Sequence, residues 1–82
     1  MSVLDGNAIA GLLHEVFGHE MTAARGVCAH CGAEGAVGEF VVHSRAPGVV
    51  ARCRACSGVL LVIVVREEIA CVDLMGLAAL ER

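Results

Sequence analysis

The sequence predicts a small α+β domain in which an N-terminal amphipathic helix packs on an antiparallel sheet. Three observations support this fold class. Apolar residues near the start recur with the period of a helix, later segments are short and rich in β-branched residues, and two C-x2-C pairs divide the chain. The 82 residues match the length of one domain, residues 1–82. A chain this short buries a limited share of its surface, so we expect a further stabilising element such as a metal.

The first predicted element is a helix over about residues 6–18. One apolar stripe with a period near 3.6 is formed by Ala8, Ile9, Leu12, Leu13, Val16 and Phe17. Asp5 or Asn7 can accept hydrogen bonds from the first free amides as the N-cap, and Gly18 is placed to end the helix. We expect this helix to lie on a sheet that the following residues, about 21–75, build around the metal site.

Between the helix and the second cysteine pair, the sequence predicts two or three strands. Residues 21–27 fit either a helix extension or a short strand, and the strand is preferred. Residues 33–36 read as a loop and residues 37–45 as a strand with one polar face, which is followed by a strand over residues 49–52. Ala46-Pro47-Gly48-Val49 matches a type II turn, since proline presets φ at the second position and glycine allows positive φ at the third.

After the second cysteine pair, residues 59–65 are all apolar and mostly β-branched, which predicts an interior strand that is apolar on both faces. Arg66-Glu67-Glu68 is a polar turn, and residues 69–74 are the last expected antiparallel strand. Gly76 interrupts that strand, and residues 77–80 are expected to end the chain as one helical turn.

The strongest motif is the pair Cys28-x2-Cys31 and Cys53-x2-Cys56, separated by 21 residues. This spacing is close to that of structural zinc sites, in which four thiolates surround the ion as a tetrahedron. We therefore expect one structural Zn²⁺ with these four cysteines as ligands. Four independent thiols, a rubredoxin-like iron site and a redox dithiol are the alternatives. A closed shell of four sulfurs has no open position for water, so the site predicts no catalysis and no enzyme.

The residues that follow each pair are expected to shape the site. Gly32 comes directly after Cys31, where a residue without Cβ lets the backbone turn toward the sulfurs. Ser57 stands at the corresponding place in the second pair, with Gly58 one residue later, so looser geometry is expected there. The arginines closest to the pairs in sequence, which can screen the thiolate charge, are Arg25, Arg52 and Arg54. Because metal binding supplies most of the folding free energy in small zinc domains, the apo chain is expected to be molten or unfolded.

The histidines suggest no second site. His14 and His19 resemble the H-E-x-x-H zinc-protease motif, but a spacing of five turns them about 140° apart around a helix. We reject that site and expect a solvated pair between Glu15 and His19. His30, within the first cysteine pair, and His43, on a polar strand face, are expected to be exposed.

The fifth cysteine, Cys71, stands alone on a predicted strand. A single strand cysteine is more often a small buried hydrophobic residue than a nucleophile, and the sequence places no histidine and aspartate to activate it.

Composition argues for a protein partner and against nucleic acid. The formal charge is −3, and four thiolates with one Zn²⁺ would bring it to −5, which opposes binding to phosphates. Two phenylalanines are the only aromatic residues, too few for a base-stacking surface. Arg45, Arg52 and Arg54 form at most a small basic patch. With a helix on one face of the sheet, the second apolar face of strand 59–65 is expected to meet a partner protein or a second copy.

Two further expectations concern location. The longest apolar run, residues 59–65, is far below the roughly 20 residues that span a bilayer, so no membrane helix is expected. Residues 1–6 lack the basic and apolar regions of a secretory signal, which favours a reducing cytoplasm and a metal in place of disulfides.

The cysteine pairs, the hairpin between them and the following strand are similar to the zinc-ribbon fold. The whole chain resembles a small uncharacterised bacterial zinc-ribbon family. The matching motifs are L-D-G-N-A at Leu4–Ala8, C-A-H-C-G at Cys28–Gly32, A-P-G-V-V at Ala46–Val50, C-x-x-C at Cys53–Cys56 and D-L-x-G-L at Asp73–Leu77. The resemblance implies a zinc ribbon with the four cysteines as ligands and brings no known activity. By analogy with other zinc ribbons, a nucleic-acid-associated module of the transcription or translation kind is the alternative to a protein-interaction module. Where the ribbon pattern usually has glycine, this chain has Ser57.

Overall fold

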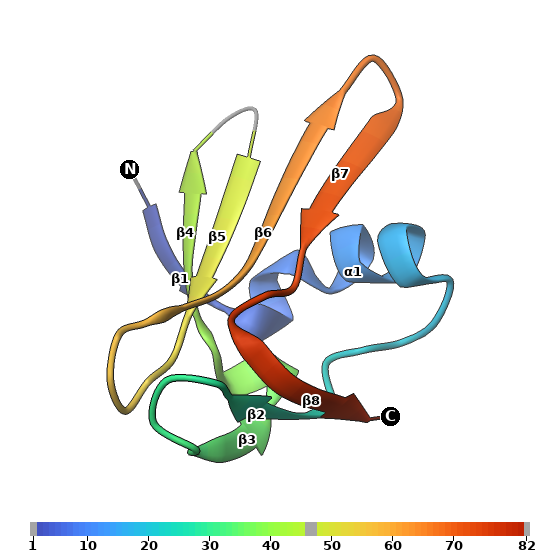
Figure 1. Cartoon of the computed structure of the whole chain (residues 1–82). Helices are drawn as coiled ribbons and strands as arrows, with labels where there is room; N and C mark the ends of the chain where they lie inside the picture. Colours follow the sequence, from blue (N-terminus) through green and yellow to red (C-terminus); the bar gives the residue numbers. More distant parts are fainter. Residues whose placement is uncertain (1, 46–47, 82) are drawn as a thin grey trace.

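A computed structural model describes residues 2–45 and 48–81, which form one helical segment and two antiparallel sheets (Figure 1). The larger sheet has the order β1-β4-β5-β6-β7, with β1 Ser2–Asp5, β4 Val41–Arg45, β5 Gly48–Arg52, β6 Val59–Arg66 and β7 Ile69–Asp73. The smaller sheet has the order β3-β2-β8, with β2 Arg25–Cys28, β3 Glu34–Ala36 and β8 Leu77–Glu81. The predicted α+β class is therefore confirmed.

The predicted helix is present, as a 3-10 turn η1 (Gly6–Ile9) that continues into α1 (Ala10–Phe17). Asp5 is its N-cap, because its Oδ1 accepts a hydrogen bond from the Ala8 amide at 3.2 Å. Gly18 is the C-cap, with φ of 74° and its amide donating to the His14 carbonyl at 2.8 Å. Both ends follow from local signals that the sequence carries.

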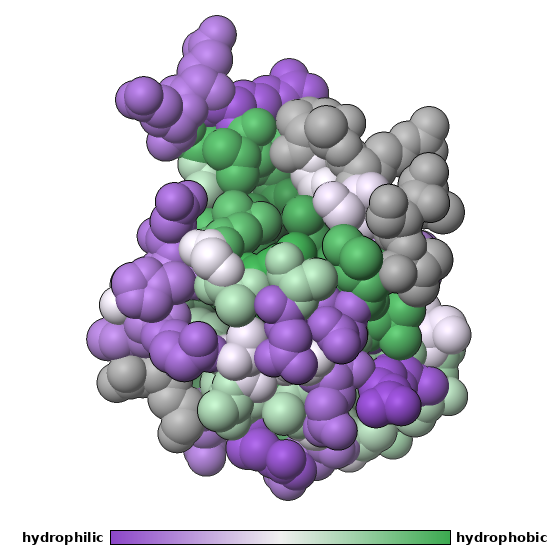
Figure 2. All heavy atoms as spheres, turned by 180° about the vertical axis from the view of Figure 1, so that it is seen from behind, coloured by the Kyte–Doolittle hydropathy of each residue, from purple (hydrophilic) through white to green (hydrophobic). Residues whose placement is uncertain are grey.

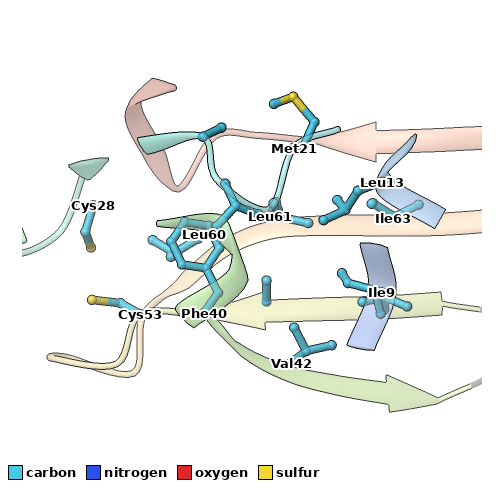
Figure 3. Close-up of a cluster of buried hydrophobic side chains, with 14 residues drawn as sticks. Ile9, Leu13, Met21, Cys28, Phe40, Val42, Cys53, Leu60, Leu61 and Ile63 are labelled. Carbon is cyan, nitrogen blue, oxygen red and sulfur yellow. The ribbon is translucent and has the colours of Figure 1, made fainter. Parts of the chain in front are cut away.

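The hydrophobic core lies between this helical segment and one face of the larger sheet. Leu13 from α1, Val42 from β4 and Ile63 from β6 are completely buried. Figure 3 shows Ile9 and Leu13 facing these sheet residues, and it shows the core continuing through Phe40, Leu60 and Leu61 to Cys28 and Cys53. Cys28 and Cys53, the first cysteine of each pair, are thus an extension of the core.

Strand β6 lies between β5 and β7, in the interior position that its sequence predicts. Leu61 and Ile63 point to the helix and are buried, whereas Val62 and Val64 are half-buried on the opposite face. The pairing register of β5 with β6 shifts after Ala51, which lets the consecutive residues Leu60 and Leu61 both be buried.

Three segments differ from the predicted elements. Residues 77–80 form most of the strand β8, not a helical turn, because β8 pairs with β2 and its Leu77 and Leu80 pack against the core. Leu-Ala-Ala-Leu fits either structure locally, so the distant pairing decides. Residues 34–36, expected to be a loop, are the short edge strand β3, and β1 precedes the helix where no strand was predicted.

Other strand boundaries are shorter than predicted. Of residues 21–27, only those from Arg25 onward belong to a strand, and residues 37–39 form the 3-10 turn η2 (Val37–Glu39) ahead of β4. The predicted turn at residues 46–49 falls partly on residues 46–47, which lie outside the described residues. Gly48 already pairs with Arg45 at the start of β5. No helix among the described residues is long and apolar enough to cross a membrane.

Candidate metal centre

The first C-x2-C loop connects β2 to β3 and is closed by two backbone hydrogen bonds. The Gly32 amide donates to the Cys28 carbonyl at 2.9 Å, and the Cys28 amide donates to the Ala33 carbonyl at 2.9 Å. Gly32 has φ of 77°, in the left-handed region where a residue without Cβ is unstrained. The expected role of this glycine in turning the backbone is therefore confirmed.

The second loop connects β5 to β6 and repeats this construction. The Ser57 amide donates to the Cys53 carbonyl at 2.9 Å, and the Cys53 amide donates to the Gly58 carbonyl at 2.9 Å. Ser57 has φ of 65°, so it adopts the conformation of Gly32 in spite of its side chain. The expectation of looser geometry is wrong for the backbone, because both loops have the same closing distances; the cost of Ser57 is conformational strain.

The two loops lie side by side at one end of the molecule and bring four sulfurs together (Figure 1). The Sγ atoms of Cys28 and Cys56 are 3.7 Å apart, as are those of Cys31 and Cys53, and all four lie within 4.8 Å of one another. A tetrahedron with metal–sulfur bonds of about 2.3 Å has edges of about 3.8 Å. The donor set and spacing therefore fit one tetrahedral metal ion.

Burial differs within each pair in the same way. Cys28 and Cys53, the first cysteine of each loop, are buried, whereas Cys31 and Cys56 are exposed. The sulfurs of Cys28 and Cys53 point into a common space at the end of the core in Figure 3. The site is anchored to the hydrophobic core on one side and open to solvent on the other.

Backbone amides point at the sulfurs and favour their ionised form. The amide of His30 donates to Cys28 Sγ at 3.3 Å, that of Ala55 to Cys53 Sγ at 3.3 Å and that of Gly58 to Cys56 Sγ at 3.4 Å. Burial opposes ionisation of Cys28, but the amides of Cys31 and His30 and the Cys56 thiol outweigh it and lower its pKa to about 6.

The two exposed thiols shift in the opposite direction. The amide of Ala33 acts to lower the pKa of Cys31, but burial and the neighbouring thiols outweigh it and raise the pKa to about 12. The amide of Gly58 acts to lower the pKa of Cys56, but desolvation of the sulfur and the thiols of Cys28 and Cys53 outweigh it, so this pKa is also raised. Crowded thiols cannot all ionise at neutral pH without a cation, so a bound divalent metal would displace protons from Cys31 and Cys56.

His30 connects the two loops. Its Nε2 lies 3.2 Å from the Val59 carbonyl oxygen, just beyond the second loop, and its ring covers Gly58 so closely that a Cβ there would stand 2.6 Å from the ring. The residue is exposed, as expected, but its ring is held against the second loop. Sequence reasoning missed this contact, because it joins residues 29 positions apart.

The arginines near the cysteines are engaged with other groups. Arg25 pairs with Glu34 at 3.3 Å and Arg54 with Glu39 at 3.8 Å, and all four side chains are more than half exposed. Arg52 donates through Nη1 to the Ser57 carbonyl at 3.0 Å and so supports the second loop. The side chain of Arg45 lies outside the described part of the structure.

The remaining sequence candidates are not brought to the metal loops. Cys71 is exposed on β7, so its predicted burial is wrong, because β7 is an edge strand. His43 is half-buried where exposure was expected, and its Nδ1 is buried with no hydrogen-bond partner among the described residues. Within residues 2–45 and 48–81 the ion pairs are the two described above, so the predicted pair between Glu15 and His19 is not formed.

A small pocket of about 280 Å³ adjoins the buried half of the site. Cys28 and Cys53 line it together with Phe40 and Leu60, and Glu39 and Arg54 are also among its lining residues. The two cysteine loops, residues 28–33 and 53–58, thus form one wall of an apolar recess.

Comparison with known protein families shows that the family described as a family of unknown function (DUF6510) matches residues 1–82. Comparison with curated proteins and with solved structures finds no match.

Proposed function

The chain belongs to a family of unknown function (DUF6510), and we propose from its own geometry that it is a zinc-binding structural module that mediates protein–protein interaction. One observation carries the proposal: four cysteine sulfurs from two matching loops lie within 4.8 Å of one another. Zinc is favoured as the ion because two C-x2-C pairs at this separation are typical of structural zinc sites. The two loops and their hairpins are also the parts of the chain that support a zinc-ribbon assignment.

Four sulfurs fill a tetrahedral shell and leave no position for a water molecule or substrate. The role proposed for the metal is therefore to fix the two loops, and no catalytic step is assigned to it. Rubredoxin-like iron needs the same four-sulfur geometry and is the alternative ion. A redox dithiol fits less well, because the 3.7 Å contacts join sulfurs of different loops, as a shared ion requires.

The interaction role is supported by the sheet face that lies opposite the helix. On β4 to β7, the described residues that alternate with the core positions are half-buried or exposed, and none is buried. Val50 and Val62 are neighbours in this face, and Val64 lies beside Cys71. These valines form an apolar strip, and His43 and Asp73 flank Val50 and Val62 in their row. An apolar strip that the described residues leave partly exposed is a typical protein-binding surface.

The nucleic-acid alternative has weaker support. Arg25 and Arg54 are paired with glutamates, and Arg52 is bound to a backbone carbonyl. The formal charge of −3, or −5 with four thiolates and Zn²⁺, leaves little attraction for phosphates.

We also propose that the protein is located in a reducing cytoplasm, where cysteine thiolates of this kind stay free of disulfides.

Two measurements test the proposal. Elemental analysis of the purified protein should give one zinc per chain, and a red, iron-containing protein would exclude a zinc module. The zinc-loaded chain should then retain a protein from its native cells, or a second copy of itself, with a yield that does not depend on salt. Retention of nucleic acid with a steep salt dependence would favour the alternative.

A further inference from the structure

Strand β7 is an exposed edge of the larger sheet. All five of its residues are exposed, and among the described strands its one neighbour is β6. Exposed large apolar side chains gather on this hairpin: Ile69 is 65% exposed, Val65 39% and Val72 38%. On the rear of the molecule, Figure 2 shows apolar residues next to the hydrophilic β6–β7 turn. Natural edge strands are usually protected by lysine, proline or a covering segment, and the sequence Ile-Ala-Cys-Val-Asp contains neither lysine nor proline.

The strand is complementary to itself. If two copies of β7 pair antiparallel about a two-fold axis at Cys71, each Cys71 faces the other. In the same register, Ala70 faces Val72 of the second copy, and Ile69 faces Asp73. No like charges then stand opposite each other. A register centred on Ala70 would instead oppose Glu67 and Asp73, two carboxylates.

The pairing of β6 with β7 extends this match across the interface. Within one chain, Ile63 is beside Val72, and Val65 is beside Ala70. On the helix side of the paired sheets, one row would therefore contain Ile63 and Val72 of the first copy and then Ala70 and Val65 of the second. No polar residue interrupts this row. On the other face, Asp73 would meet Ile69 of the second copy, and Arg66 lies next in that row. On this face, the row that contains Asp73 therefore also contains an arginine of the second copy, so it carries opposite charges. The row on the helix side is apolar.

We propose that the chain self-associates through β7, in an antiparallel two-fold pair centred on Cys71 that joins two of the larger sheets into one. This inference rests on the proposed interaction role and names its partner, a second copy of this chain. A copy is favoured over an unrelated strand because the register about Cys71 sets no like charges opposite each other and continues the apolar row of the helix side across the interface.

The first test is sedimentation equilibrium of the zinc-loaded chain up to about 100 μM, since small interfaces give weak dimers. Two variants place one lysine on the same strand. Cys71→Lys puts two cations opposite each other and should weaken the dimer at least about tenfold. Ile69→Lys puts a cation opposite Asp73 and should keep the dimer. A monomeric wild type, or equal loss in both variants, overturns the proposal; the second result would indicate non-specific apolar association or another occupant.

The second test uses the wild-type chain, in which Cys71 itself can cross-link the two copies. Residues directly opposite in an antiparallel pair have Cα atoms about 4.5 to 5.5 Å apart, within the range of about 4.4 to 6.8 Å that a disulfide requires. Oxidised glutathione, which takes up the two electrons and two protons released, should link two Cys71 residues into a covalent dimer. Cys71→Ala should stop this reaction, and adding Ile69→Cys to that variant should not restore it, because position 69 faces position 73. Restoration would exclude the proposed register.

Zinc content separates this proposal from the proposed function. Cys71 lies outside the four-sulfur cluster, so Cys71→Lys should retain one zinc per chain and the wild-type circular dichroism. A monomer with zinc bound contradicts self-association alone, whereas a chain that binds no metal contradicts the proposed function.

Discussion

Cys53→Ser tests whether the metal supplies the stability of the fold. Cys53 is 6% exposed and joins the four-sulfur cluster to the end of the core. Structural zinc contributes on the order of 10 kcal/mol or more to small domains at neutral pH. The net stability of 82 residues is about 4 to 12 kcal/mol, so the metal term is as large as the whole. We expect the variant to bind zinc poorly and to lose its cooperative unfolding transition.

Urea and thermal unfolding followed by circular dichroism, together with zinc analysis, provide the measurement. Cys71→Ser is the matched control, because it makes the same substitution at an exposed cysteine away from the cluster. At concentrations where the chain is monomeric, it should change the free energy of unfolding by no more than about 0.5 kcal/mol. Cooperative unfolding of metal-free Cys53→Ser, or of the chelated wild type, would refute the reasoning.

Three further predictions concern the metal loops. Ser57→Gly should raise the free energy of unfolding of the zinc form by about 1 kcal/mol, measured by urea unfolding, because φ is 65° at this position; no gain would show that the side chain is not strained. Gly58→Ala should lower it by about 1 kcal/mol or more, since the new Cβ would displace the His30 ring and its contact with Val59; unchanged stability would exclude that contact as a support. Finally, zinc affinity should fall as the pH is lowered from 8 to 7, by about a hundredfold in competition with a chelator, because the raised pKa values of Cys31 and Cys56 mean that binding releases at least two protons. A tenfold or smaller change would contradict that last prediction.

Elements with local signals could be predicted from the sequence. The bounds of the helix are predictable because Asp5 and Gly18 act on backbone groups within four residues of them. The cysteine cluster was found because two C-x2-C pairs restrict the chemistry before any fold is known.

Elements that depend on distant pairing could not be predicted. Strand β8 exists because Leu77 pairs opposite Cys28, about fifty residues earlier, and nothing within Leu-Ala-Ala-Leu distinguishes a strand from a helical turn. The exposure of Cys71 follows from the edge position of β7, which the order of strands in the sequence does not reveal. The link from His30 to Val59 also forms only when the two loops are side by side.

The metal centre and the turn between β6 and β7 lie at opposite ends of strand β6. The second loop leads directly into β6 at Val59, and β6 is the strand on which β7 is built (Figure 1). Because the loop fixes the start of β6, loss of the metal would disturb both the core at Leu60 and the edge presented by β7. None of the five β7 residues belongs to the sulfur cluster, but the chain that follows β7 contacts the first loop, because the Gly76 carbonyl accepts a hydrogen bond from the Ala29 amide at 2.9 Å. A structural metal at this place would therefore hold both ends of the β6–β7 hairpin and shape the surface of β7 without taking part in the contact.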